Sequence, residues 1–211
     1  MIFPAGDFRL KNRTNQGVEF QGAAWCHNLT MITSLKYTWA DLSLMPDDGK
    51  RREIIEGEIY VTPSPVDHHQ MILFNLTMAL GKFLETHPLG KLRFAPLDVI
   101  LSEHDVLEPD LLLVLNEHTN ILQDWVRGAP DLVIEILSPT TAARDRGIKL
   151  KAYARYGIAE YWIVDPAAQA IEMYRLTADG FRLFATRAKD SSVETPLLPG
   201  FSLAVAPVFK P

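Results

Sequence analysis

Two short apolar segments of the chain each carry a carboxylate where an apolar side chain would be expected. Asp110 opens the apolar run 111–115, and Glu135 lies inside the run 131–137. Both runs are rich in strand-forming residues and bounded by turn residues, which predicts two buried strands. An ionised carboxylate without a partner would be costly there, so we expect each one to meet a lysine or a metal ion.

A lysine near two strand carboxylates is a recurrent arrangement for phosphodiester hydrolysis, and Lys149 follows in the next predicted helix. Carboxylates hold Mg²⁺ or Mn²⁺, the metal polarises the phosphate and activates a water, and the lysine orients that water or stabilises developing charge. Helix caps and surface salt bridges produce the same spacing, so structural roles stay open at this point.

The N-terminal half is predicted to supply two helices and a hairpin that help to position these residues. Thr38 is a plausible N-cap for a short helix. Glu56-Gly57 is placed to join two short strands. Asp67 can cap a longer helix that runs to about Glu85, because apolar residues recur there at helical spacing.

A third strand is predicted at residues 94–101. The following turn would return the chain antiparallel into the Asp110 run, which would place Asp98 on a strand beside Asp110. Lys149 is expected on a helix that ends at Gly157. Because Gly147 weakens that helix by about 1 kcal/mol relative to Ala, we expect the helix to begin only near Asp145.

The C-terminal part is predicted to add strands to the sheet. Residues 160–165 predict a buried strand, and residues 170–186 predict an outer hairpin around Ala178-Asp179-Gly180. Residues 197–201 are expected to return apolar cover to the sheet.

Length and composition predict one ordinary globular domain. The chain has 211 residues, of which 47% are hydrophobic and 22% charged, enough for one core and too few for two comfortable domains. Residues 1–30 lack sustained periodicity, so we interpret them as an extension, with an extra strand on the sheet as the alternative, and assign the domain to residues 31–211.

Charge and cysteine content limit the classes of function. The net charge of −5 argues against a protein that holds nucleic acid through a broad basic face, so any nucleic-acid contact must be local. The single cysteine excludes an internal disulfide and a cysteine-rich zinc site. No segment has the ~20 apolar residues of a membrane span or the pattern of a signal peptide, so we expect a soluble cytoplasmic protein without membrane contact.

A series of short motifs in order along residues 38–205 resembles a restriction-endonuclease domain family, abundant in cyanobacteria, of the PD-(D/E)xK nuclease superfamily. The motifs are Glu56-Gly57-Glu58, Thr62-Pro63-Ser64-Pro65 followed by His69-Gln70, Pro109-Asp110, 133–139, Asp145 with Lys149 and Tyr153, Gly157, 160–166 and 197–200. The resemblance implies a mixed α+β fold of the α/β type. Its restriction-endonuclease-like core would be a central mixed sheet flanked by helices, with an added N-terminal hairpin and C-terminal strands.

The resemblance also implies roles for individual residues. Asp110 and Glu135 take the places of the two superfamily acids, with the Ile136 carbonyl as a further metal ligand. One departure is that Leu137 stands where the superfamily has its lysine. Lys149, on the following helix, looks like the relocated replacement.

Asp145 and Tyr153 lie four residues on either side of Lys149, where they could hold its amine. A surface ion pair and an aromatic residue at the edge of the core are their alternative roles. Asp98 is a further candidate metal ligand or else a solvated residue near a strand end.

Glu58, His69 and Gln70 enter as candidates through the resemblance alone. Glu58 is otherwise a charge on an exposed hairpin face, and His69 is otherwise a polar residue near a helix start.

We therefore expect a Mg²⁺- or Mn²⁺-dependent endonuclease that acts on DNA. The alternatives are a catalytically silent nuclease-fold module for binding or assembly, and a metal-dependent hydrolase of a small phosphoester. A homodimer is expected, with residues 170–186 as contact, because many nucleases of this superfamily cut two strands with two copies of one site.

Overall fold

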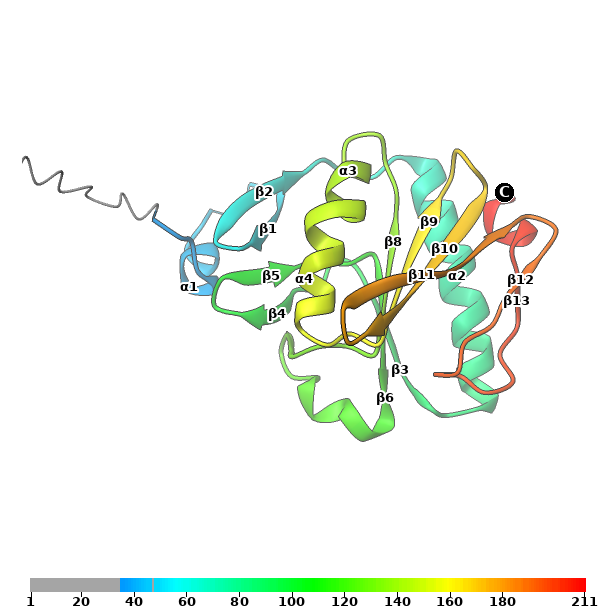
Figure 1. The fold of residues 1–211 in the computed structure, drawn as a ribbon. Helices are drawn as coiled ribbons and strands as arrows, with labels where there is room; N and C mark the ends of the chain where they lie inside the picture. Colours follow the sequence, from blue (N-terminus) through cyan, green and yellow to red (C-terminus); the bar gives the residue numbers. More distant parts are fainter. Residues whose placement is uncertain (1–34, 47) are drawn as a thin grey trace, which may run out of the picture. The chain divides into compact units, whose positions relative to one another are not determined.

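A six-stranded mixed sheet is the centre of the fold (Figure 1). The computed structural model describes residues 35–46 and 48–211, so the predicted extension at residues 1–30 and its boundary lie outside the described residues. The strand order is β11, β10, β9, β8, β6, β3, with β8 parallel to β9 and all other neighbours antiparallel. The bounds are β3 Gly90–Phe94, β6 Leu111–Leu115, β8 Leu132–Ile136, β9 Glu160–Asp165, β10 Ala170–Thr177 and β11 Gly180–Ala188.

A second sheet contains the predicted hairpin, which is confirmed. Its order is β2 (Glu58–Thr62), β1 (Arg51–Ile55), β5 (Asp105–Leu107), β4 (Val99–Ser102) and β7 (Val126–Arg127). Glu56 and Gly57 both adopt positive φ angles, 55° and 82°, as a tight hairpin turn requires. Glycine is needed at position 57 because an added Cβ would also lie 2.6 Å from Lys36 Cβ.

The two helices predicted in the N-terminal half are present. Helix α1 (Trp39–Ser43) has Thr38 at its N-cap, as predicted. The Thr38 hydroxyl accepts the Asp41 amide in a capping box. Helix α2 (Asp67–Thr86) follows the predicted span. The predicted cap is wrong, however, because Val66 occupies the N-cap position and makes no side-chain hydrogen bond. Asp67 lies in the first turn, where its negative charge interacts favourably with the helix dipole.

The third strand predicted at residues 94–101 is wrong, because the chain changes sheets within it. β3 ends at Phe94 in the six-stranded sheet, and β4 begins at Val99 in the other. Pro96 has no N–H group to donate to a ladder, which favours a break at this point. The predicted reversal after it is present as the β4–β5 hairpin.

The helical segment that carries Lys149 begins three residues earlier than predicted. It consists of α3 (Ala142–Arg144), a π-helical turn (Asp145–Lys149) and α4 (Leu150–Arg155). The cost of Gly147 does not delay the start, because the Ala142 amide already bonds the Ser138 carbonyl at 3.0 Å. The end is as predicted, with Gly157 at a φ of 82°.

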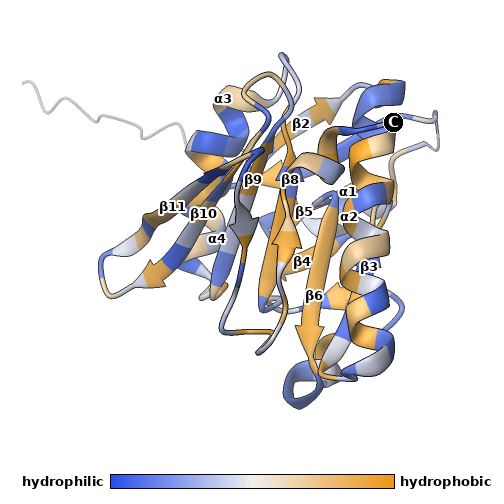
Figure 2. Ribbon diagram, turned by 90° about the vertical axis from the view of Figure 1, so that its right-hand side faces the viewer, coloured by the Kyte–Doolittle hydropathy of each residue, from blue (hydrophilic) through white to orange (hydrophobic). Residues whose placement is uncertain are grey.

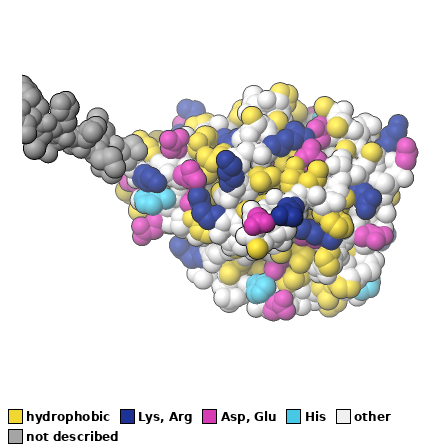
Figure 3. All heavy atoms as spheres, viewed as in Figure 1, with side chains coloured by type: hydrophobic (Ala, Val, Ile, Leu, Met, Phe, Trp, Pro, Cys, Tyr) yellow, Lys and Arg dark blue, Asp and Glu magenta, His cyan; other side chains and the backbone are white. Residues whose placement is uncertain are grey.

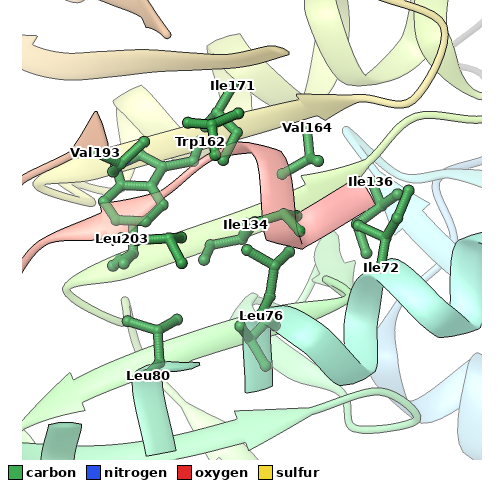
Figure 4. Packing of buried hydrophobic residues seen from close by; sticks show 14 of the residues in the cluster. Ile72, Leu76, Leu80, Ile134, Ile136, Trp162, Val164, Ile171, Val193 and Leu203 are labelled. Atoms are coloured by element: carbon green, nitrogen blue, oxygen red, sulfur yellow. The ribbon is translucent and has the colours of Figure 1, made fainter. Parts of the chain in front are cut away.

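The two faces of the six-stranded sheet are covered by different elements. Figure 4 shows Ile72, Leu76 and Leu80 of α2 packed against strand residues that include Ile134 and Trp162. The opposite face carries α4 and the second sheet, whose buried residues form a separate cluster with the remaining side chains of β6, β8 and β9. In Figure 2 the inner strands β6 and β8 are the most apolar, which fits strands buried on both faces.

The C-terminal elements follow the predictions. β10 and β11 form the outer hairpin, and Leu198 and Phe201 are buried against the α2 side of the sheet. The remaining elements are a 3₁₀ helix at Asn116–Ile121, β12 (Ser192–Val193), β13 (Leu203–Ala204) and a 3₁₀ helix at Ala206–Phe209. Among the helices of the described residues, none combines the length and apolarity needed to cross a bilayer.

Candidate active site

Asp110 and Glu135 lie opposite each other at one end of the sheet. β6 and β8 are antiparallel with Leu111 paired to Ile134, so one further step along the register brings Asp110 opposite Glu135. Asp110 is only 5% exposed to solvent and Glu135 only 4%. The structure therefore brings together the two strand acids that the sequence singled out, and Leu137 shares the face of Glu135 as expected.

Lys149 reaches this pair of acids from the helix. Its ammonium Nζ lies 2.8 Å from Glu135 Oε1, 2.7 Å from Glu53 Oε1 and 3.7 Å from Asp145 Oδ1. The π-helical turn places both of its terminal residues, Asp145 and Lys149, in the buried interior. Burial alone would lower the pKa of Lys149, but the three carboxylates, Glu135 first, hold the pKa above its ordinary value. The lysine is thus a fixed cation at the end of the strands.

Glu135 is held in place by two donors. Its Oε1 accepts hydrogen bonds from Lys149 Nζ and from the Tyr153 hydroxyl, each at 2.8 Å. Burial raises the pKa of Glu135 to about 8, because desolvation and the neighbouring acids outweigh the attraction of Lys149. Tyr153 therefore positions the carboxylate and not the amine, which differs from the role expected for it.

Asp110 is held by different donors. Its Oδ2 accepts the Ile136 amide at 2.8 Å and lies 3.2 Å from His69 Nε2. Burial by itself would raise the pKa of Asp110, but the His69 contact and the Ile136 amide lower it overall. The pKa values of the two neighbouring acids are thus shifted in opposite directions, and Asp110 is the one that favours the ionised form.

One oxygen of each acid remains available to a ligand. Within residues 35–46 and 48–211, no side chain or amide hydrogen-bonds Asp110 Oδ1 or Glu135 Oε2, and both residues line one pocket. The Ile136 carbonyl lies on the same side of β8 as its amide, which is the side of Asp110.

This donor set fits a hard divalent cation. In the part of the chain that the structure describes, no group of three or more His, Cys, Asp and Glu side chains is arranged to hold a metal. Mg²⁺, however, is commonly bound by one or two carboxylates with waters completing its shell. Two carboxylate oxygens and a backbone carbonyl meet that requirement.

A pocket of about 400 Å³ contains these groups. Its wall includes Asp110, Glu135, Lys149 and the residues around them, Glu53, His69 and Asp145. Arg51, Arg144 and two connecting segments, 62–66 and 138–141, complete it. Arg144 is tied to the first segment by a 2.7 Å hydrogen bond to the Thr62 hydroxyl. These two segments therefore form part of the pocket wall around the acids.

Comparison with known proteins gives the family. Residues 39–206 match the model of Uma2, a family described as "putative restriction endonuclease". The chain belongs to the Uma2 family. The match confirms the resemblance inferred from the motifs, and covers almost the same span.

Two relatives extend the comparison of this Uma2 chain. The uncharacterized protein slr1290 of Synechocystis sp. is 24% identical over 165 residues, which are 76% of this chain and 84% of the relative. A crystal structure described as a putative nuclease belonging to DUF820, from Anabaena variabilis, matches with a TM-score of 0.69 and 21% identity. The match covers 82% of this chain and 97% of that chain, and it confirms the predicted mixed α+β, nuclease-like fold.

Asp98 does not join the site of this Uma2 chain. It precedes β4 in the other sheet and lines a second hollow, which shares Arg51 and Glu108 with the pocket of the two acids. Burial and the charge of Glu53 raise its pKa. Because β4 and β6 are not neighbours, the expectation that Asp98 lies on a strand beside Asp110 is wrong.

The other secondary candidates divide between the pocket and the surface. His69 and Asp145 line the pocket and are buried, so Asp145 is not part of a surface pair. Glu58 is exposed and accepts a hydrogen bond from Tyr60, and Gln70 is exposed on α2. The structure thus brings neither Glu58 nor Gln70 into the pocket.

Glu53 is a site residue that the sequence analysis missed, as are Arg51 and Arg144. It is 2% exposed, binds the Lys149 ammonium, and accepts the Glu108 amide at 3.0 Å. Its Oε2 is buried without a hydrogen bond from any described residue. The sequence does contain a signal for Glu53, because it is a carboxylate two positions from Ile55 on an apolar strand face. A carboxylate in an apolar strand is also the feature that selected Asp110 and Glu135.

Proposed function

We propose that this Uma2 chain is a Mg²⁺- or Mn²⁺-dependent endonuclease that hydrolyses DNA phosphodiester bonds in the pocket between β6, β8 and α4. The observation that carries the proposal is the position of Lys149. Although it comes from a helix and not from β8, its ammonium lies 2.8 Å from Glu135, on the face that also carries Asp110. Membership of Uma2 supports nuclease chemistry at such a site.

Each residue has a distinct task in this proposal. Asp110 Oδ1, Glu135 Oε2 and the Ile136 carbonyl would hold the metal, which when bound would polarise the phosphodiester and activate water for attack on phosphorus. Tyr153 and His69 keep the two carboxylates in place through the bonds described above.

Lys149 supplies positive charge close to the reacting phosphate. Its ammonium is already oriented by Glu53 and Glu135, so it needs no rearrangement to stabilise negative charge that grows on the phosphoryl oxygens. Such a group lowers the barrier more than it strengthens binding.

A second candidate function is hydrolysis of a small phosphoester, and the pocket favours it. A volume of about 400 Å³ lies in the range of small-molecule sites. A catalytically silent module is a weaker alternative, because it would gain nothing from burying several charges whose desolvation is costly.

Cleavage assays on the purified full chain distinguish these functions. The protein is incubated with Mn²⁺ and single-stranded, duplex or branched DNA, or with bis(p-nitrophenyl) phosphate as a generic phosphodiester. We expect cleavage of DNA that Asp110→Ala abolishes and Asp179→Ala, an exposed acid in the β10–β11 turn, retains. Cleavage of the small diester alone would favour the second function, and no Asp110-dependent cleavage of any substrate would favour the silent module.

A further inference from the structure

The reactive groups lie at the bottom of the pocket, and this position bears on the form of nucleic acid that can reach them. Asp110 and Glu135 are almost fully buried, whereas Pro63, Ser64 and Pro139 line the same pocket and are exposed. The exposed lining residues therefore form the mouth, and the acids form the floor.

The mouth is formed by two connecting segments, the first of which is braced by Arg144. Its two sides are the segments 62–66, which connects β2 to α2, and 138–141, which connects β8 to α3; both lie at the top of the view in Figure 1. The Arg144 guanidinium ties the first segment to α3 by donating to the Thr62 hydroxyl, and within the second segment the Ser138 amide donates to the Thr141 hydroxyl at 3.3 Å. Moving the first segment away from α3 would break the bond between Arg144 and Thr62.

A continuous duplex does not fit this shape. A volume of about 400 Å³ is that of a small-molecule site, whereas a duplex is a stiff rod made of two paired strands. The backbone of a duplex is convex and stiff, so a paired strand can touch the mouth but cannot bend one phosphate down to the floor. A single strand is thin and flexible enough to do so.

The chemistry of the mouth favours the same substrate. Prolines at positions 63, 65 and 139 offer apolar surface, which suits the faces of sugars and unstacked bases. A duplex hides its bases and presents phosphates outward. The face seen in Figure 3 carries Lys and Arg interspersed with Asp and Glu, so this face offers no continuous basic track to a duplex backbone.

Positive groups for the strand are placed inside the pocket. Arg51 and Arg144 both line it, next to the acids. Arg144 Nε is buried, and no described residue accepts its hydrogen bond. Arg51 is already paired with Glu108 through its Nε at 2.6 Å, so a phosphate oxygen next to the scissile bond would supply the missing acceptor for Arg144 and a further acceptor for Arg51.

We propose that the site acts on an unpaired strand, one that is single-stranded or locally splayed out of a duplex, and that segments 62–66 and 138–141 exclude continuous duplex. This inference rests on the proposed nuclease function and adds the form of its substrate. Arg51 and Arg144 position the strand by binding the phosphates beside the one that is cleaved.

Binding provides a test that does not depend on turnover. A fluorescein-labelled oligonucleotide, alone or annealed to its full complement, is titrated with the parent protein in Ca²⁺, which takes the same oxygen ligands as Mg²⁺. The same titration is repeated with Lys149→Ala in Mn²⁺, because this variant should bind the oligonucleotide but cleave it slowly. We expect the single strand to bind at least about tenfold more tightly in fluorescence anisotropy, because it loses no base pairing on entry. Equal affinities for the two forms would overturn the inference.

Cleavage provides the second test, with substrates that have no ends. A single-stranded circle and the relaxed, covalently closed duplex circle of the same sequence are incubated with the parent protein and Mn²⁺. The duplex must open roughly two stacked base steps before one strand can enter the pocket. We therefore expect the duplex circle to be cleaved about a hundredfold more slowly than the single-stranded circle. Asp110-dependent cleavage of both circles at one rate would overturn this inference and leave the proposed function standing. No cleavage of either circle, with no binding of either oligonucleotide, would overturn both.

Discussion

Lys149 is the cation shared by three buried carboxylates, so replacing it with methionine should destabilise the domain. Its ammonium contacts Glu53, Glu135 and Asp145, and all four residues are less than 5% exposed. Removing one partner of a buried ion pair costs ~3–5 kcal/mol, because the remaining charge is left uncompensated. Uptake of a proton by one carboxylate offsets part of this, so we expect a loss of about 2–4 kcal/mol at pH 7, out of the ~5–15 kcal/mol typical of a domain.

Urea unfolding measures this loss directly. The midpoint should fall in Lys149→Met while the slope of the free energy against urea stays that of the parent. Lys151→Met is the matched control, because Lys151 is exposed two residues further along and its replacement should change stability by no more than about 0.5 kcal/mol. Mn²⁺ should stabilise Lys149→Met more than it stabilises the parent, since a bound cation replaces part of the lost charge.

The same position separates catalysis from binding. Lys149→Ala should keep most of its affinity for metal and DNA but lose roughly 100-fold or more in single-turnover cleavage, the usual scale for a positioned electrostatic group. Lys149→Arg should not restore the rate, because a planar guanidinium cannot replace a compact ammonium. A parental cleavage rate in Lys149→Ala, or equal stability of the two methionine variants, would refute this reasoning.

Three further predictions follow from the same geometry. Asp110→Ala and Glu135→Ala should each abolish the heat of Mn²⁺ binding in calorimetry, because each removes a carboxylate ligand, whereas Asp179→Ala should not; undiminished heat in both variants would rule out the metal assignment. Glu53→Gln should remain folded but cleave about tenfold more slowly, because Lys149 loses one of its anchors, and an unchanged rate would make Glu53 structural only. Light scattering at micromolar concentration should show a dimer, since β11 (Gly180–Ala188) is an edge strand of its sheet, and a monomer would count against that expectation.

Much of the fold could be predicted because it depends on local patterns. The turn at Glu56-Gly57, the apolar spacing of α2 and the glycine at the end of α4 act over a few residues, and all three occur as predicted. Asp110 and Glu135 could be found for the same reason. A carboxylate in a buried strand is visible in the sequence, and antiparallel pairing of the two strands then brings the carboxylates together.

The parts that could not be predicted depend on how elements pack. Apart from Pro96, which cannot donate to a sheet ladder, the run 94–101 gives no sign that its two ends belong to different sheets, so Asp98 was placed beside Asp110 although it lies elsewhere. Glu53 reaches Lys149 only because the second sheet packs against the face that carries α4. Tyr153 could equally have reached the lysine or the glutamate, and its hydroxyl bonds Glu135.

Metal-dependent cleavage at the Asp110–Glu135 pair is the central claim, and single-turnover cleavage of an end-labelled DNA strand tests it most directly. Parent protein and Glu135→Gln, which keeps the shape of the side chain but removes its charge, are compared in Mn²⁺ and in EDTA. We predict cleavage by the parent in Mn²⁺ alone and no cleavage by Glu135→Gln in either condition. Cleavage that persists in EDTA, or a parental rate in Glu135→Gln, would contradict the claim.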